Sequence, residues 1–191
     1  MLELAALGLL QQKPLHGYYL KQQLELFMSG CISVNYGSIY PLLKRLEQRG
    51  AISVLIETEG EGGSGRKIYS ISEQGRMLWR QKMLEHPQES WVNARSRFAI
   101  KFFFFSYLEP ERRIKLLEHR LMVCKLRLEE RAIDPMPSDP YQAAVITHCR
   151  EVVQQEIQWL SQQLHRERTN LSSKNSTPIA IETQIISSPL E

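Results

Sequence analysis

The chain has 191 residues, of which 42% are hydrophobic and 24% are charged, and this composition is typical of a globular protein. Its formal net charge is only +3, which excludes a globally basic surface, so binding to nucleic acid would depend on the local placement of cations. The three cysteines, Cys31, Cys124 and Cys149, are odd in number and lack C-x-x-C spacing, which indicates a reducing compartment and no disulfide scaffold.

The first two helices are predicted over residues 1–12 and 15–28, with Pro14 and Gly17 marking the bend between them. The opening segment lacks a cationic n-region and an A-x-A-like cleavage site, so it is not read as a signal peptide. Residues 98–108 are apolar over barely eleven positions and contain Lys101, far below the roughly 20 residues that a membrane span needs. We therefore expect a cytoplasmic protein without a membrane partner.

A short amphipathic helix is predicted over about residues 35–49. Asn35 suits its N-cap, and Gly50 suits the position just past its end. Apolar residues recur at offsets of three, four and seven and must face a core: Ile39, Leu42, Leu43 and Leu46. The opposite face mixes small, hydroxyl and basic groups, which suit phosphates and base edges: Gly37, Pro41, Lys44 and Gln48, flanked by Ser38, Tyr40 and Arg45.

Two strands follow Gly50, because apolar residues then alternate with polar ones at Ile52, Val54 and Ile56 and again around Tyr69. The glycine-rich loop GEGGSG joins them and delivers Arg66 and Lys67 to the side of the preceding helix. A helix followed by such a hairpin is a winged helix, and its wing can reach the adjacent minor groove.

One feature weakens the expected wing contact. The incoming strand carries three carboxylates, which repel a phosphate chain unless they point away: Glu57, Glu59 and Glu61. Alternation places all three on one face, where they can lie opposite Arg66 and Lys67. Taken alone, the hairpin is equally well explained as a solvated one with an incidental basic pair.

A fourth helix, capped by Ser72, is predicted to continue to about Glu85, and His86 with Pro87 then marks a domain boundary. Helical segments separated by prolines fill residues 87–170. Two of them carry stripes with coiled-coil-like spacing: Ile114, Leu117, Leu121, Cys124 and Leu128, then Val145, Cys149, Val152, Val153, Ile157, Leu160 and Leu164. The stripes can bury against each other, and the apolar stretch 98–108 leaves surface for a second chain. Residues 171–191 are predicted to be a disordered tail.

Three stretches together resemble the PadR-like transcriptional regulators: LGLLQQKPLHGYYLKQQL at 7–24, YGSIYPLLKRLEQRGAI at 36–52 and GRKIYSISEQG at 65–75. Residues 87 to about 168 resemble, in length and helix count, the helical C-terminal domain of the long form of this family, first described in virulence-gene activators. The expected fold is mainly α with a small two-stranded β wing: a winged helix-turn-helix domain at 1–86, a helical dimerisation domain at 87–170 and the tail.

The resemblance implies a homodimeric regulator of transcription, a repressor like most relatives, whose helix enters the major groove of double-stranded DNA. The expected contact residues are Tyr36, Ser38, Tyr40, Lys44, Arg45, Gln48, Arg66 and Lys67. Lys44 and Arg45 are assigned to phosphate or guanine edges, the hydroxyl groups to phosphates and nearby bases, and the wing pair to the minor groove or its backbone. A two-fold dimer predicts an inverted-repeat operator with half-sites roughly 34–36 Å apart or a multiple of that distance.

Two other functions remain open. Trp79, Trp91, Phe98 and Phe102 could line a pocket for a small aromatic effector, although the sequence favours a role for the same rings in a core or a dimer interface. The winged helix could instead bind a protein through its acidic wing. No G-x-S-x-G, P-loop or H-E-x-x-H motif is present, and the spacing of the histidines and cysteines does not suit zinc, so no enzyme, cofactor or metal is expected.

Overall fold

The computed structural model describes residues 1–28, 36–58, 66–132 and 137–175. The chain forms two compact units, Met1–Tyr107 and Leu108–Glu191, and each is described by itself. Asn35, Cys31 and the whole glycine-rich loop GEGGSG lie outside the described residues, as does the chain after residue 175. The expected fold class, mainly α with a small β wing, is confirmed, with one more strand than predicted.

The first unit is built around a short, almost wholly buried helix, α1 (Leu2–Leu10), in which every residue from Leu4 to Leu10 is buried. The other helices of this unit are α2 (Gly17–Met28), α3 (Ile39–Gln48), α4 (Glu73–Leu84) and α5 (Trp91–Phe103), with 3-10 turns η1 (Tyr36–Ser38) and η2 (Phe105–Tyr107). Leu20 and Leu24 of α2 are fully buried. A helix that is apolar all round belongs inside a domain, and α1 therefore forms a centre on which α2, α4 and β3 pack.

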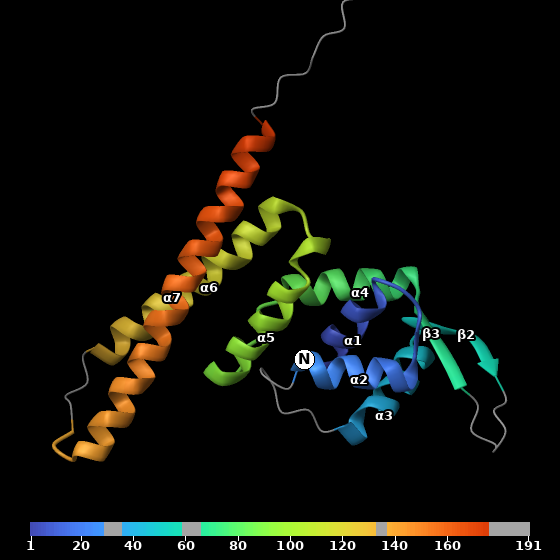
Figure 1. The fold of residues 1–191 in the computed structure, drawn as a ribbon, viewed down its shortest axis with the longest axis horizontal. Helices are drawn as coiled ribbons and strands as arrows, with labels where there is room; N and C mark the ends of the chain where they lie inside the picture. The colour runs from blue at the N-terminus through green and yellow to red at the C-terminus, as the bar shows by residue number, and fades with distance from the viewer. Residues whose placement is uncertain (29–35, 59–65, 133–136, 176–191) are drawn as a thin grey trace, which may run out of the picture. The chain divides into compact units, whose positions relative to one another are not determined.

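The sheet has three strands in the order β1-β3-β2, comprising β1 (Leu15–His16), β2 (Ile52–Thr58) and β3 (Arg66–Ile71). The expectation of a two-stranded wing is corrected, because β1 pairs antiparallel with β3 through Leu15 opposite Tyr69. The β2–β3 hairpin itself lies where it was predicted (Figure 1). Its register shifts between Val54 and Ile56, so the strict alternation expected along β2 is interrupted by a bulge.

The end of α3 is joined tightly to the start of α4. Gly50 adopts φ 67°. Its N–H donates to the carbonyl of Glu47 at 2.9 Å, and the N–H of Ala51 donates to the carbonyl of Leu46 at 2.9 Å. These two bonds form a Schellman motif. Ser72 Oγ donates to the carbonyl of Gly50 at 2.5 Å and accepts from the Gly75 N–H at 3.0 Å. The predicted roles of Gly50 and Ser72 as caps are confirmed.

The first unit extends beyond the boundary predicted after residue 86. Phe104 is fully buried, its ring lies 6.3 Å from that of Trp79 in an edge-to-face arrangement, and a β-carbon at Gly8 would lie 2.5 Å from it. Most of the apolar stretch 98–108 is therefore used inside the chain. Lys101 is 3% exposed, and its Nζ donates to the carbonyl of Glu85 at the end of α4. Burial, together with the nearby Arg97 charge, lowers the pKa of Lys101 to about 8.

The second unit is a helical hairpin of α6 (Pro110–Ala132) and α7 (Pro140–Asn175), which pack along each other (Figure 1). Asp139 caps α7 by accepting the N–H groups of Tyr141 and Gln142 at 3.0 and 2.9 Å. The helix runs to Asn175, past the start of the predicted tail. An ion pair is buried in the seam, where Arg120 Nη2 lies 2.7 Å from Glu156 Oε1.

The two predicted stripes are only partly buried. The buried members are Leu117, Cys124, Val153, Leu160 and Leu164. Val145 is 62% exposed and Cys149 is also exposed, which differs from the prediction that the whole α7 stripe is buried. The reason is that α7, with 36 residues, is longer than α6, with 23.

Candidate nucleic-acid interface

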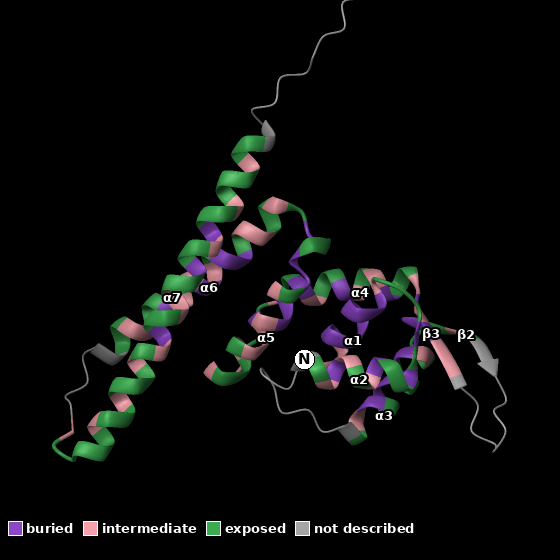
Figure 2. Cartoon of the chain, viewed as in Figure 1, coloured by how far each residue is buried: buried purple, intermediate pink, exposed green. Residues whose placement is uncertain are grey.

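Helix α3 is anchored by its apolar stripe as the periodicity predicts. Ile39, Leu43 and Leu46 are fully buried, and Leu42 is 4% exposed. Burying each of these side chains contributes about 1.5–3 kcal/mol, so the four hold the helix firmly against the unit. Because one face is fixed inward, the orientation of the opposite face is also fixed (Figure 2).

The outward face of α3 lines an open groove. The residues that line it are Gly37, Ser38, Pro41, Lys44, Arg45 and Gln48. The side chains of Lys44, Arg45 and Gln48 are exposed, and Ser38 is half-buried. Among the described residues, no carboxylate lies within ion-pair distance of Lys44 or Arg45. Their charges are therefore available to an anionic ligand.

The helix begins later than the sequence predicts. Residues Tyr36–Ser38 form a 3-10 turn, and α3 starts at Ile39, so the predicted start at about residue 35 is corrected. Pro41 is then the third residue of the helix, where the missing N–H has no intrahelical partner to lose. The turn also places Gly37 and Ser38 at the mouth of the groove. The side chain of Tyr36 lies outside the described residues.

Tyr40 is 53% exposed and lies beside the first residue of α2. A β-carbon at Gly17 would lie 3.2 Å from Cε2 of the buried Tyr69 and 3.5 Å from Cε1 of Tyr40. Gly17 therefore allows α2, α3 and β3 to approach closely and supports the Tyr40 ring. From the sequence alone Gly17 is assigned only to a bend, because the spacing along the chain gives no sign of a contact with residues so distant in sequence.

The wing strands place their charged residues opposite one another. Glu57 pairs with Lys67 across the hairpin, and Thr58 pairs with Arg66. Lys67 is half-buried, and the side chains of Glu57 and Arg66, with Glu59 and Glu61, lie outside what the structure describes. The described part of the wing therefore presents less positive charge than α3.

Arg49 and Lys82 are paired with the same carboxylate, that of Glu3. Glu3 of α1 lies 3.2 Å from Arg49 Nη1 and 3.8 Å from Lys82 Nζ. Arg49 follows the last residue of α3 and fixes that end of the helix to α1. Of the three cations between residues 44 and 49, Lys44 and Arg45 are therefore the two for which the described residues supply no carboxylate partner.

Three of the four aromatic residues proposed for an effector pocket, Trp79, Phe98 and Phe102, pack on other rings. Trp79 is 2% exposed and meets Phe104 and Tyr107 edge to face, at 6.3 and 6.1 Å between ring centroids. Phe98 and Phe102 lie 6.3 Å apart and both contact Phe105. This packing favours their role as core residues.

Two further features of the described ranges limit the chemistry. No group of three His, Cys, Asp or Glu side chains within these ranges is arranged to hold a metal ion. Of the helices that can be described, none combines the length and the apolarity of a membrane span.

Comparison with known proteins identifies the N-terminal part of the chain. Residues 6–81 match the Transcriptional regulator PadR-like family. The Negative transcriptional regulator PadR of Bacillus subtilis (strain 168) is 27% identical over 134 residues, which cover 68% of this chain and 70% of that protein. The crystal structure of Bacillus subtilis PadR in complex with operator DNA aligns over 87% of this chain and 98% of that one, with 23% identity and a TM-score of 0.42. The Vibrio cholerae virulence activator AphA aligns over 92% and 99%, with 15% identity and a TM-score of 0.40.

Proposed function

We propose that this chain, a PadR-like transcriptional regulator by the match of its residues 6–81, acts as a homodimeric repressor that binds an inverted-repeat operator. In this proposal α3 enters the major groove and the β2–β3 wing contacts the flanking backbone or minor groove. The proposed DNA-contacting residues are Tyr36, Ser38, Tyr40, Lys44, Arg45, Gln48, Arg66 and Lys67.

The observation that supports this proposal most strongly is the outward face of α3. Four buried apolar side chains fix the helix, while Lys44, Arg45 and Gln48 stand exposed along one groove. Lysine and arginine bind phosphates and guanine edges, and glutamine can pair with adenine. A rigid helix with a cationic, amide-bearing face therefore suits both positioning and base reading.

Dimerisation is proposed to involve the second unit. Met122 and Leu126, four residues apart on α6, are 51% and 50% exposed, and Val145 on α7 is 62% exposed. Apolar side chains at such spacing form a stripe that a second chain can cover. A two-fold interface repeats the recognition helix about a dyad, which is why the operator is expected to be an inverted repeat. Replacing Met122 and Leu126 with glutamate should shift the protein toward monomers in sedimentation experiments.

The test is DNase footprinting and a low-salt mobility-shift assay on the promoter of the protein's own gene. The wild type should protect an inverted repeat, and a Lys44→Ala, Arg45→Ala double variant should lose protection. Lys44→Ala alone should weaken all sequences alike, whereas loss of a base-reading Arg45 should cost roughly 1–3 kcal/mol and relax preference at one position.

A matched control removes the same charge elsewhere. Arg112 and Lys115 are exposed on α6 in the second unit, so an Arg112→Ala, Lys115→Ala variant lowers the net charge equally. It should bind DNA as the wild type does. Equal binding by the wild type, the Lys44→Ala, Arg45→Ala variant and this control would contradict the assignment of α3. Salt-independent binding to a protein partner through the wing would instead favour the alternative that the winged helix binds a protein.

A further inference from the structure

A single carboxylate holds the cation that follows the end of α3. Arg49 comes directly after the last residue of α3, and its Nη1 donates to Glu3 Oε1 at 3.2 Å. Glu3 lies in the first turn of α1, and the same oxygen lies 3.8 Å from Lys82 Nζ on α4. Figure 1 shows α1 between α3 and α4. The carboxylate of Glu3 therefore joins three helices of the first unit.

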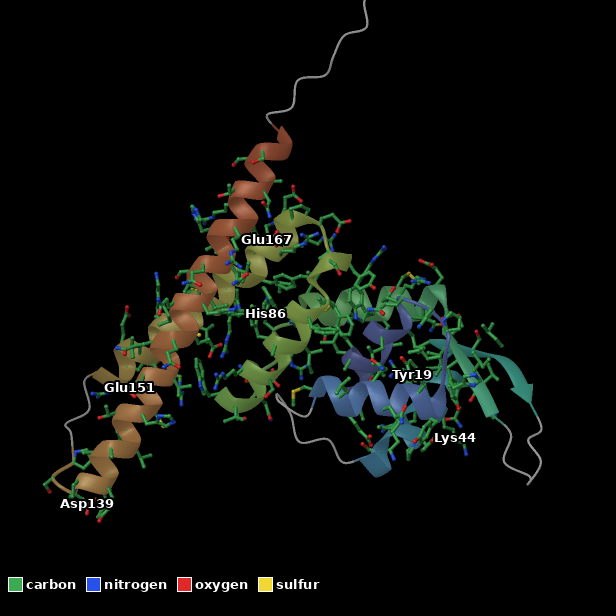
Figure 3. The ribbon with its side chains drawn as sticks, in the orientation of Figure 1. Tyr19, Lys44, His86, Asp139, Glu151 and Glu167 are labelled. Carbon is green, nitrogen blue, oxygen red and sulfur yellow. The ribbon has the colours of Figure 1, made fainter. Side chains whose placement is uncertain are left out.

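Arg49 lies next to the surface that is assigned to DNA. It comes four residues after Arg45, and residues at this spacing are neighbours on the surface of a helix. Figure 3 labels Lys44 on the same helix. The side chain of Arg49 is 54% exposed, whereas that of Glu3 is 21% exposed. Water thus reaches the guanidinium more freely than the carboxylate, and the long arginine side chain can leave the ion pair for another anion.

The ion pair competes with DNA for the charge of Arg49. A pair of this exposure shifts an equilibrium by about fivefold or less, so it restrains the arginine without locking it in place. An arginine that reaches a phosphate releases a counterion, and this gain does not depend on the base sequence. Removing the carboxylate of Glu3 would therefore make Arg49 available to any DNA.

We propose that Glu3 is a specificity-determining residue, which keeps Arg49 on the protein and so withholds a phosphate contact that would strengthen binding to non-operator DNA. This inference rests on the proposed function, because it needs α3 in the groove of DNA. On the operator, base contacts fix the register of α3, and Arg49 cannot shift to the nearest phosphate. On other DNA the binding is essentially all electrostatic, so a released Arg49 adds to it directly. Specificity is the difference between these two binding free energies.

The experiment measures the affinity of the full chain for two duplexes across a series of salt concentrations. One duplex is the footprinted promoter segment, and the other is a scrambled duplex of the same length and base composition. Glu3→Gln should steepen the slope of log K against log salt on the scrambled duplex by about 0.9 per bound subunit, which is about an eightfold gain at 0.1 M salt relative to 1 M. The operator slope should stay as in the wild type, so the ratio of the two affinities falls.

A matched control removes a carboxylate from another ion pair. Glu118 Oε1 lies 2.6 Å from Arg168 Nη2 in the second unit, and both side chains are exposed. Glu118→Gln therefore changes the net charge by the same amount and also releases an arginine. It should leave the slopes on both duplexes unchanged.

Variants of Arg49 identify the released cation. Arg49→Gln alone should leave the wild-type slope on the scrambled duplex unchanged, because Glu3 already withholds this arginine from DNA. Combining Arg49→Gln with Glu3→Gln should cancel the gain of Glu3→Gln, since both changes act on one contact. Arg49→Gln also decides the question if Glu3→Gln does not fold. A shallower slope for Arg49→Gln would mean that Arg49 already contacts phosphate in the wild type, and the proposal would be wrong.

The outcomes distinguish the inference from the function on which it rests. If Glu3→Gln behaves like Glu118→Gln while Lys44→Gln weakens binding, the inference is wrong and the α3 assignment stands. If both duplexes gain equally from Glu3→Gln, Glu3 limits affinity without setting specificity, and the inference is again wrong. A gain that persists in the double variant would mean that Lys82 is the released cation. If the wild type shows no salt-dependent binding and Lys44→Gln has no effect, the proposed function fails and the inference fails with it.

Discussion

Replacing Phe104 with alanine tests whether η2 and the end of α5 belong to the same cooperative unit as the winged helix. Phe104 is fully buried, packs edge to face on Trp79 and lies against Gly8 of the central helix α1. Its neighbour Phe103 is 52% exposed, although its ring centroid lies only 5.0 Å from that of Phe104. The two adjacent residues therefore form a matched pair of the same type, one inside the unit and one at its surface.

The expected cost differs by several kilocalories per mole. Truncating a fully buried phenylalanine costs about 3–5 kcal/mol, because the transfer energy is lost and a cavity remains. Truncating Phe103 should cost about 1 kcal/mol or less, since half of the side chain is already in water. With a urea m-value of about 2 kcal/mol/M, the unfolding midpoint of the Phe104→Ala variant should fall by roughly 1.5–2.5 M.

The assay is urea unfolding followed by the fluorescence of Trp79, which contacts Phe104. Trp91 and Trp159 are replaced with phenylalanine in every protein, so the signal reports the first unit alone. Analysis by unit is needed because a protein with two compact units need not unfold in one transition. Far-ultraviolet circular dichroism follows the helices of both units in parallel, so a transition that Trp79 does not report belongs to the helical hairpin of α6 and α7.

The assignment of η2 and the end of α5 to the first unit is refuted if Phe104→Ala and Phe103→Ala shift the Trp79 transition equally. It is also refuted if Phe104→Ala leaves that transition unchanged and lowers only the transition of the helical hairpin. In the latter case the segment would belong to the second unit, as a boundary after residue 86 predicts.

Two further substitutions test buried charges. Burial lowers the pKa of Lys101 from 10.5 to about 8, so between these pH values the unfolded chain binds more protons than the folded one. The free energy of unfolding should therefore rise with pH across this window. The rise should be at most about 3 kcal/mol, and less where solvent reaches the amine. Lys101→Met should flatten this dependence in chemical denaturation at pH 8 and 10, whereas an unchanged dependence would place its origin elsewhere. In the α6–α7 seam, Arg120→Met alone should cost about 3–5 kcal/mol by leaving Glu156 buried, while Arg120→Met with Glu156→Leu should restore most of the stability in thermal unfolding. A double variant as unstable as the single one would contradict that interpretation.

Local patterns predicted the parts of the fold that depend on local physics. The stripe of α3 follows from a period of 3.6 residues, and Gly50 marks the end of the helix because a residue with φ 67° favours glycine. Ser72 was identified as a cap because its side chain acts on an N–H only three residues away. The exposed face of α3 follows at once from the buried one, so the candidate site could be located from the sequence alone.

The features that were missed depend on residues far apart in the chain. Strand β1 has only two residues, and it exists because Leu15 pairs with Tyr69. Pro87 correctly marks the end of α4 but not the end of the unit, since the packing of Phe104 on α1 is invisible to local patterns. Arg120 lies within an apolar seam and is buried there only because Glu156 is beside it.

The salt dependence of binding can also decide whether two subunits bind DNA about a dyad. Each phosphate contact contributes about −0.9 to the slope of log K against log salt, whatever the number of contacts in one subunit. A symmetric dimer makes each contact twice, so the slope on a duplex with the full inverted repeat should be twice the slope on a half-site. If Lys44 contacts phosphate, Lys44→Gln should reduce the full-site slope by about 1.8 and the half-site slope by about 0.9. The net charge of +3 makes this measurement informative, because diffuse attraction contributes little to either slope. Equal slopes on the two duplexes would mean that a single subunit contacts DNA, and the inverted-repeat operator would then be rejected even if Lys44 proved to be a contact.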